Sequence, residues 1–233
     1  MLSKSTTTNL KVVDDIVERS EVIKTLGVWF DSELSLKRYV NEKCKVAFFN
    51  IRNIRSIRKF ISDDLCMKLV QSLVLSHLDY CNSILYGLPM CELNKIQRVI
   101  NCAAKLVLGK GRRDSASEAL FKLHILPVIY RIEFKIATLV YKCLHDSAPC
   151  YLKELLKPAT QNRSLRSSSC VREGDLEVPF TRRSTFLDRS FAVSGPKVWN
   201  SLPRHLRERS SLETFKEELK TFYMRVAFPQ FSR

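Results

Sequence analysis

The order of apolar and polar residues divides this chain into a short extended part and a long helical part. Residues 11–16 and 22–30 are rich in β-branched side chains and predict two strands. Gly27 interrupts the second run, which indicates that another group approaches the backbone there. Beyond Leu36, apolar residues recur at intervals of three and four, the period of an α-helix. The pattern therefore predicts a mainly α chain with a small N-terminal β piece.

The first predicted helix, residues 36–57, has two faces of opposite character. Asp31 or Ser32 is placed to cap its start. Its apolar face comprises Val40, Cys44, Ala47, Phe48, Ile51 and Ile54. The opposite side is basic, because residues 37–59 contain eight Lys or Arg and a single acid, Glu42. A solvated helix face normally mixes both signs, so phosphate contact and plain solvation both remain open for these cations.

Start and stop residues bound the next predicted helices. Ser62 begins a second helix that ends at Gly87 and Pro89, with apolar positions at Leu65, Leu69, Leu73 and Cys81. A third helix is expected at 93–108, a short one at 115–123, and a further one from Pro127. Together these helices predict one helical domain at 33–158, behind a β piece at 1–32.

The composition changes after Pro158. Residues 161–169, QNRSLRSSS, are polar and basic and indicate a linker or an exposed arm. Residues 176–203 hold apolar anchors without a helical period, so irregular extended structure is expected. Ser210 and Glu213 form a capping box for a final helix with a buried face of Leu212, Phe215, Leu219 and Phe222. We therefore expect a third part, a basic extended segment with a C-terminal helix, at 159–233.

Charge gives the first indication of function. Lys and Arg number 39 against 24 Asp and Glu, a formal net charge of +15, which attracts DNA, RNA or an anionic membrane surface. No apolar stretch approaches the roughly 20 residues that cross a bilayer, and residues 1–10 lack the apolar run of a signal peptide. We therefore expect an intracellular protein, cytoplasmic or nuclear, with no membrane partner. Its eight cysteines lack zinc-ligand spacing and are expected to be mostly core residues.

Carboxylates and histidines supply only incomplete catalytic patterns. Asp14 and Asp15 resemble a two-metal pair, but such a site needs a further carboxylate from another strand, so a polar turn between strands is the favoured interpretation. Asp63 and Asp64 follow a capping serine, where acids favour the helix dipole. His77 and Asp79 are two apart on a predicted helix and point to different faces. No catalytic residue and no metal ligand is therefore predicted.

A second basic set lies in loop-like sequence. It contains Arg163, Arg166, Arg172, Arg182, Arg183 and Arg189. Guanidinium groups donate bidentate hydrogen bonds and suit phosphate. The same arginines suit a structural role in which they tie loops to carboxylates on the helices, and the sequence leaves both interpretations open.

Five phrases stand out together: KTLGVWFDSELSLKRYV at 24–40, LVLSHLDYCNSILYGLP at 73–89, LNKIQRVINCAAKLVLG at 93–109, LHILPVIYRIEFKIATLVYKCL at 123–144 and VPFTRRSTFLDRSFAVSGPKVWNSLP at 178–203. In this order they resemble the C-terminal part of non-LTR retrotransposon (LINE) reverse transcriptases of the jockey-like and chicken-repeat type. The resemblance covers residues 10–225. It implies an RNA-directed DNA polymerase with fingers, palm and thumb.

The resemblance also indicates what is missing from this sequence. The family's catalytic aspartates lie in an aromatic-x-Asp-Asp hairpin of the palm and use Mg²⁺. Here Val12 and Val13 replace the aromatic start, and Asp15 lies only 11 residues before Leu26. Asp14 and Asp15 thus match the turn before the Leu-Gly-Val strand. We expect no cofactor in this chain and no polymerisation by it alone.

What the resemblance retains is the part that holds nucleic acid. Leu26, Gly27 and Val28 match the family's primer grip, a strand that supports the primer 3′ end. The helices that follow would correspond to the thumb, which holds template–primer through its phosphates. The candidate nucleic-acid-binding residues are Lys37, Arg38, Lys45, Arg52, Arg55, Arg58, Lys59, Arg163, Arg166, Arg182 and Arg183.

Two other classes of protein remain open. One is a free-standing RNA- or DNA-binding protein derived from a transposable element. The other is a helical scaffold that binds protein, since a missing palm and fingers would leave apolar surface uncovered. A translated remnant without a selected role is the plainest alternative.

Overall fold

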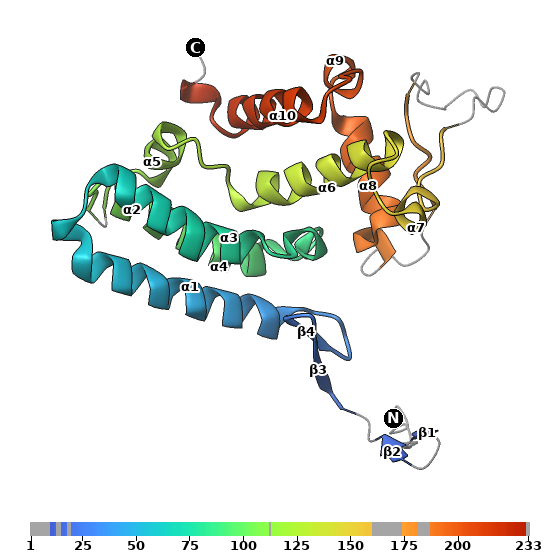
Figure 1. Ribbon diagram of the computed structural model, residues 1–233, viewed down its shortest axis with the longest axis horizontal. Helices are drawn as coiled ribbons and strands as arrows, with labels where there is room; N and C mark the ends of the chain where they lie inside the picture. The colour runs from blue at the N-terminus through green and yellow to red at the C-terminus, as the bar shows by residue number, and fades with distance from the viewer. Residues whose placement is uncertain are drawn as a thin grey trace.

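The computed structural model describes residues 10–12, 15–17, 20–111, 113–159, 174–180 and 187–231. It is mainly helical, with short antiparallel strand pairs at the N-terminus (Figure 1). The helices lie in successive layers. α1 packs on α4, α4 on α6, and α6 on both α8 and α10. One buried apolar cluster runs through these layers from Val28 to Phe228, so it joins the predicted central and C-terminal parts.

The N-terminal strands form two hairpins. β1 (Leu10–Val12) pairs with β2 (Asp15–Val17), and β3 (Val22–Thr25) pairs with β4 (Val28–Asp31). The small N-terminal β piece is therefore confirmed, and each of the extended runs expected at 11–16 and 22–30 is folded into a hairpin. Between β3 and β4 the chain turns at Leu26 and Gly27, whose φ angles are 48° and 80°. A two-residue hairpin loop of this kind requires positive φ at both positions, which explains the glycine.

Helix α1 (Lys37–Ile57) begins after a turn that Asp31 organises. The Asp31 carboxylate accepts hydrogen bonds from the backbone N–H groups of Glu33, Ser35 and Leu36, at 3.2, 2.8 and 3.0 Å. Burial raises the pKa of this carboxyl, but the hydrogen bonds outweigh burial and leave the pKa below its ordinary value. Asp31 thus fixes the turn before the helix, while Leu36, in the left-handed region, occupies the N-cap itself.

The buried face of α1 confirms five of the six predicted positions. Val40, Cys44, Ala47, Ile51 and Ile54 are buried, together with Tyr39 and Lys43. Phe48 is 39% exposed, so its assignment to the core is wrong. Its neighbours one and two turns on are Arg52 and Arg55. Phe48 therefore lies at the margin between the core and the basic face.

The second predicted helix is continuous to Asp79, but a different face is buried. It comprises α2 (Asp63–Val70), a π-helical turn η2 (Gln71–Leu75) and α3 (Ser76–Asp79), and Ser62 caps its start as predicted. It ends at Tyr80, earlier than the predicted stop at Gly87. Leu65 and Leu73 are exposed. The fully buried positions are Cys66, Val70, Val74 and Leu78, which share the same four-residue spacing.

The middle of the chain follows the predicted boundaries closely. A 3₁₀ turn, η3 (Asn82–Leu85), leads to α4 (Met90–Val107), α5 (Ala116–Lys122), α6 (Val128–Leu144) and the short α7 (Cys150–Lys153). Ser115 caps α5 through its hydroxyl, and Pro127 directly precedes α6. Proline suits a helix start because the first turn needs no backbone donor from it.

The C-terminal part is more helical than predicted. α8 (Phe191–Ser201) occupies sequence that was expected to be irregular, and it contains Gly195 and Pro196. Gly195 is what lets α8 lie close to α6, because a Cβ there would meet a Val140 methyl at 3.2 Å. Gly195 and Pro196 are typical helix-breaking residues in a sequence. In this helix, however, Gly195 permits close packing.

The last two helices are α9 (Arg204–Arg207) and α10 (Leu212–Ala227). The predicted capping box is wrong, since the N-cap is Ser211 and no side chain caps the helix. The Ser211 hydroxyl donates instead to the Glu213 carboxylate, at 3.1 Å. The predicted inner face is confirmed, with Phe215 and Leu219 fully buried and Leu212 and Phe222 partly so.

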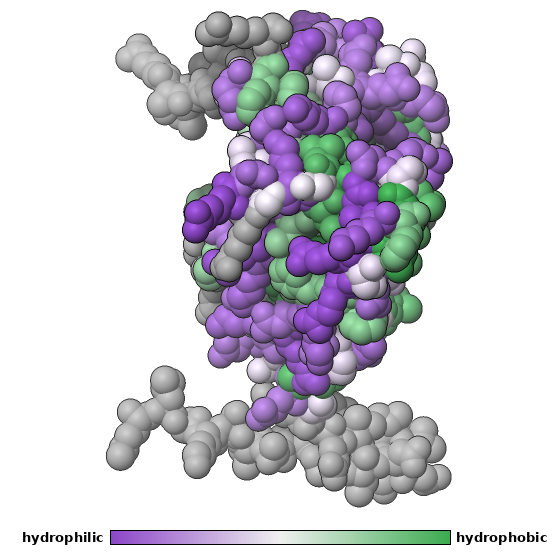
Figure 2. Space-filling model, turned by 90° about the vertical axis from the view of Figure 1, so that its left-hand side faces the viewer, coloured by the Kyte–Doolittle hydropathy of each residue, from purple (hydrophilic) through white to green (hydrophobic). Residues whose placement is uncertain are grey.

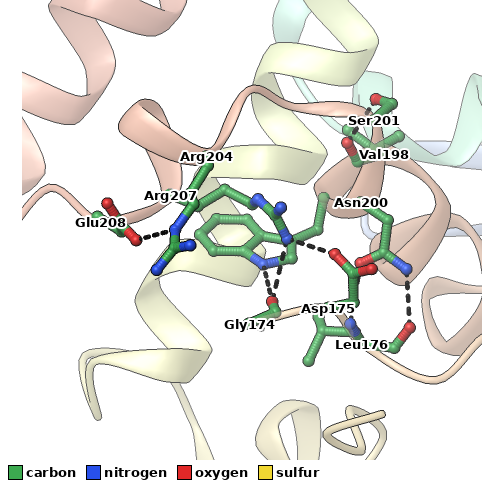
Figure 3. Close-up of polar contacts among 10 residues, drawn as sticks. Gly174, Asp175, Leu176, Val198, Asn200, Ser201, Arg204, Arg207 and Glu208 are labelled. Carbon is green, nitrogen blue, oxygen red and sulfur yellow. Dashed lines mark hydrogen bonds and ion pairs between the residues drawn. The ribbon is translucent and has the colours of Figure 1, made fainter. Parts of the chain in front are cut away.

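A polar clamp fastens residues 174–176 to α8 and α9 (Figure 3). The Arg207 guanidinium donates to the Asp175 carboxylate at 2.7 Å and to the Gly174 carbonyl at 3.2 Å. Asn200 binds both backbone groups of Leu176, accepting at 2.9 Å and donating at 2.8 Å. Leu176 also forms a β-bridge with Pro158. The clamp therefore holds this segment against the helices.

A buried lysine joins α1 to the end of α3. Lys43 Nζ donates to the Tyr80 carbonyl at 2.7 Å and to the His77 carbonyl, and it lies 5.0 Å from the Tyr39 ring centroid. Tyr39 Oη also donates to the Tyr80 carbonyl, at 3.0 Å. Since the last carbonyls of a helix have no partner within it, Lys43 caps α3 from a neighbouring helix.

Replacing this lysine tests the cap. Lys43→Met should lower the free energy of unfolding by about 1–3 kcal/mol, because two carbonyls lose a buried donor. Burial lowers the pKa of Lys43 from 10.5 to about 8. Between these values the unfolded chain binds more protons, so the native protein should gain stability relative to the variant as pH rises through this window. Urea unfolding of both proteins from pH 7 upward measures the difference, and parallel curves would contradict it.

Candidate nucleic-acid interface

Six of the predicted binding residues form an exposed cationic face along α1 and the turn after it. They are Lys37, Arg38, Lys45, Arg52, Arg55 and Lys59. Within the described residues, none of the six has a carboxylate within salt-bridge distance. We call this set the α1 cationic face. Its members remain available to an anion from outside the chain.

Several cations elsewhere are paired with carboxylates of this chain. Arg131 pairs with Asp79, Arg207 with Asp175 at 2.7 Å, and Lys95 with Glu92 at 2.8 Å. The first two arginines are almost buried, so their charges stabilise the fold. The contrast sets the α1 cationic face apart from these structural ion pairs.

Arg58 was predicted to contact nucleic acid, but it serves the fold. Its guanidinium donates to the carbonyls of Leu106 and Val107 at the end of α4, at 3.1 and 2.9 Å, and to the Asp63 carboxylate. It also donates to the carbonyl of Ile61, at 3.0 Å. These bonds cap α4 and join it to the turn between α1 and α2, so we leave Arg58 out of the α1 cationic face.

The β3–β4 hairpin adds an aromatic ring to one end of the face. The Arg38 guanidinium lies 4.1 Å from the Trp29 ring centroid, and Lys24 Nζ lies 5.3 Å from it. Trp29 and Lys24 are directly opposite each other in the hairpin. Neither residue is among the binding residues predicted from the sequence. The hairpin register places them together, and an extended run alone does not specify that register.

The primer-grip-like residues occupy the tip of this hairpin. Leu26 is 84% exposed, Gly27 completes the turn, and Val28 begins β4 and is buried. Tyr80 Oη donates to the Leu26 carbonyl at 2.8 Å, and a Cβ on Gly27 would lie 3.5 Å from the Tyr80 ring. The close approach predicted at Gly27 is therefore confirmed, and the approaching group is a tyrosine of this chain.

A cleft continues the cationic surface towards the end of α4. It has a volume of about 510 Å³ and is lined by Arg55, Arg58, Cys102, Lys105, Leu106, Gly109, Lys110 and Gly111. Lys110 pairs with Glu118 at 2.7 Å. Figure 2 views this end of the molecule, and hydrophilic residues cover most of it, with apolar residues exposed between them. The cleft extends the positive surface beyond the single face of α1.

The loop arginines of the second basic set are only partly placed. Arg163, Arg166, Arg172, Arg182 and Arg183 lie outside the described residues. Arg189 is described, and its Nη2 donates to the Leu34 carbonyl at 2.7 Å. Its aliphatic stem lies against Gly87. Arg189 thus joins the segment before α8 to the turn before α1, a structural role for one member of this set.

The weak catalytic patterns take ordinary structural partners. Asp79 binds Arg131 instead of His77, whose Nε2 is buried without a hydrogen-bond partner in the described chain. Burial lowers the pKa of His77, and the nearby Lys43 charge lowers it further. Asp15 begins β2, opposite Val12, while Asp14 lies outside the described residues. In the part of the chain that the structure describes, no three His, Cys, Asp or Glu side chains gather as metal ligands would.

Comparison with family models, with curated proteins and with solved structures finds no match to this chain. Within the described ranges, every helix is too short or too polar to span a bilayer.

The hairpin tip offers a matched pair of glycine substitutions. Gly27→Ala should destabilise the β3–β4 hairpin by about 1–2 kcal/mol, because a side chain disfavours φ of +80°. Gly109→Ala is the control, since φ there is +60° and nothing lies within 4 Å of the added Cβ. Amide hydrogen exchange should show faster exchange in residues 22–31 for Gly27→Ala only. Equal exchange in the hairpin of both variants would contradict the requirement for glycine at this turn.

Proposed function

We propose that this chain holds nucleic acid by its phosphate backbone along the α1 cationic face. The observation that carries the proposal is the absence, within the described residues, of any carboxylate partner for six exposed cations on one face. Unpaired cations in a row attract a linear polyanion, because each phosphate contact releases condensed counterions. The net charge of +15 adds long-range attraction to this local arrangement.

The spacing of the cations suits a regularly repeating anion. Arg38, Lys45, Arg52 and Lys59 are seven residues apart, which corresponds to steps of about 10.5 Å along a helix. Phosphates of one strand follow at about 3.4 Å along a duplex axis, so each step spans about three nucleotides. The six members of the face are all Lys or Arg, which contact phosphates in any sequence, and we propose that binding depends on shape and charge more than on sequence.

The resemblance to non-LTR reverse transcriptases gives this binding a context. We propose that the chain corresponds to the thumb and downstream region, which holds template and primer. In the polymerases that it resembles, nucleotide addition takes place at an aromatic-x-Asp-Asp hairpin with Mg²⁺, and that motif does not occur in this sequence. The role proposed for this chain is therefore to hold nucleic acid, with the chemistry supplied by a palm outside this sequence.

Salt-dependent binding tests the α1 cationic face. The variant with Arg38, Lys45, Arg52 and Arg55 changed to Gln should bind a fluorescein-labelled RNA–DNA hybrid more weakly. Its slope of log K against log salt should be smaller by about 3, because each lost phosphate contact removes about 0.7–0.9. Fluorescence anisotropy between about 50 and 200 mM salt measures both quantities.

A matched variant separates the face from the total charge. Lys135, Lys142, Lys220 and Arg225 lie on α6 and α10, away from α1. Changing these four to Gln removes the same charge, so its salt slope should stay close to that of the native chain. Equal losses in the two variants would indicate attraction by net charge alone and would reject the assignment to α1.

A further inference from the structure

Apolar side chains that are unusually exposed line the seam between α1 and α2. Phe49 is 60% exposed and Phe60, just after α1, is 85% exposed. The set consists of Val46, Phe49, Ile57, Phe60, Leu65 and Leu73, and we call it the apolar seam. Apolar side chains at such exposure have an unfavourable contact with water. A group of them on one surface marks an interaction site more often than a surface that only contacts water.

Contacts across the two helices place these side chains on one surface. α1 packs against both α2 and the π-helical turn η2. Asn50, the neighbour of Phe49, donates from Nδ2 to the Leu73 carbonyl at 2.9 Å, so the two helices touch at this level. Leu65, Leu69 and Leu73 follow at intervals of four, and Val46, Phe49 and Ile57 are spaced by three and eight, so each set lies along one side of its helix.

The π-helical turn explains why Leu73 is turned outward. A π turn inserts one extra residue into the helix, and here the Ser76 N–H binds the Gln71 carbonyl five residues back. The adjacent Val74 and Leu75 are buried while Leu73 is 45% exposed. π turns occur frequently at functional sites, and this one contains Leu73 of the apolar seam.

The charges around the seam are mostly positive. Lys45, Arg52 and Lys59 lie along its α1 edge, and Lys68 lies on α2. The acids nearby are Glu42, Asp63 and Asp64. Asp63 pairs with Arg58, and Asp64 pairs with Lys68 at 2.7 Å. The rim that remains unpaired is therefore cationic, apart from Glu42.

We propose that the apolar seam binds an acidic amphipathic helix of a protein partner. A helix laid along the seam would place its apolar residues at i, i+4 and i+7 between α1 and α2, and its carboxylates against the cationic rim. From Val46 to Ile57 the seam runs for about 16 Å along α1, which matches about three turns of a partner helix. This inference stands on apolar exposure and does not depend on the proposed nucleic-acid binding.

Charge and side-chain type exclude the other occupants. A second copy of this chain would bring the same cationic rim against itself, and like charges across an interface are unfavourable. Nucleic acid would use aromatic rings for stacking; the seam offers only Phe49 and Phe60, and its other four members are aliphatic. Only an acidic apolar segment satisfies both parts of the surface.

Two synthetic helical peptides test the inference with the full chain. Both carry leucines at i, i+4 and i+7 and a fluorescein label, and they differ only in flanking residues, glutamate in one and lysine in the other. The glutamate peptide should bind the chain saturably in fluorescence anisotropy, at least about tenfold more tightly than the lysine peptide. Absence of saturable binding by the glutamate peptide, or equal binding of both, would overturn the proposal.

Neutral substitutions locate the binding on the chain. Phe49→Ser with Leu73→Ser should weaken the glutamate peptide at least about tenfold, because exposed apolar anchors are removed. The matched control is Tyr151→Ser with Phe180→Ser, which removes two exposed aromatic side chains elsewhere and should bind the peptide as the native chain does. Circular dichroism checks that both variants keep their helix content. If the first double variant loses helix, the single variant Phe49→Ser is used in its place.

Two further outcomes would name a different occupant. Sedimentation velocity that shows a dimer of the native chain, abolished by Phe49→Ser with Leu73→Ser, would favour a second copy. A loss of affinity for the RNA–DNA hybrid in the same variant, with peptide binding unchanged, would assign the seam to nucleic acid. Either result would overturn the inference. The first does not involve nucleic acid, and the second requires that the native chain binds the hybrid.

Discussion

The Tyr80 carbonyl, at the C-terminal end of α3, is the point at which three parts of the chain meet. Lys43 and Tyr39 of α1 donate to it, while the Tyr80 hydroxyl donates to the hairpin tip at Leu26. Burial raises the pKa of Tyr39, which keeps this hydroxyl protonated and able to donate. Tyr80 therefore accepts hydrogen bonds from α1 and donates one to the hairpin. These bonds fix the direction of α1 and the position of Trp29 together. The α1 cationic face and its aromatic end depend on this junction.

A second constraint is the way in which the acids are distributed. Buried or half-buried arginines such as Arg131 and Arg207 have carboxylates close by, which burial requires since an unpaired charge in the interior is very unfavourable. The exposed cations of α1 have water as a partner and do not need an acid for stability. Their one-signed arrangement therefore cannot be explained by the fold, and it requires a cause in binding or in solubility.

Periodicity predicted the helices well and their orientation less well. Start residues such as Ser62 and Ser115 act as caps, and five of six core positions of α1 are buried as expected. The failures share a cause. On α2, two apolar rows with the same spacing compete, and only packing against α1 and α4 selects the row of Cys66 and Val70. In α8, Gly195 permits close contact with α6, a tertiary effect that local propensity does not contain. The cationic residues of α1 were predictable from charge alone, whereas Trp29 and the structural role of Arg58 required the fold.

The same selection of one apolar row over another creates the surface that remains. Had the row of Leu65 been buried, α2 would present Cys66 and Val70 to solvent, and small side chains would leave little apolar area. Burying the smaller row instead leaves Leu65 and Leu73 exposed, with Leu69 between them partly buried. A chain that needed only a stable bundle would bury its larger side chains, because burial stabilises in proportion to apolar area. The exposed leucines are therefore better explained by contact with another molecule than by the stability of this chain.

Lys45 and Arg52 belong both to the α1 cationic face and to the rim of the apolar seam. An acidic helix and a phosphate backbone would therefore compete for the same cations, and α1 would bind one of them at a time.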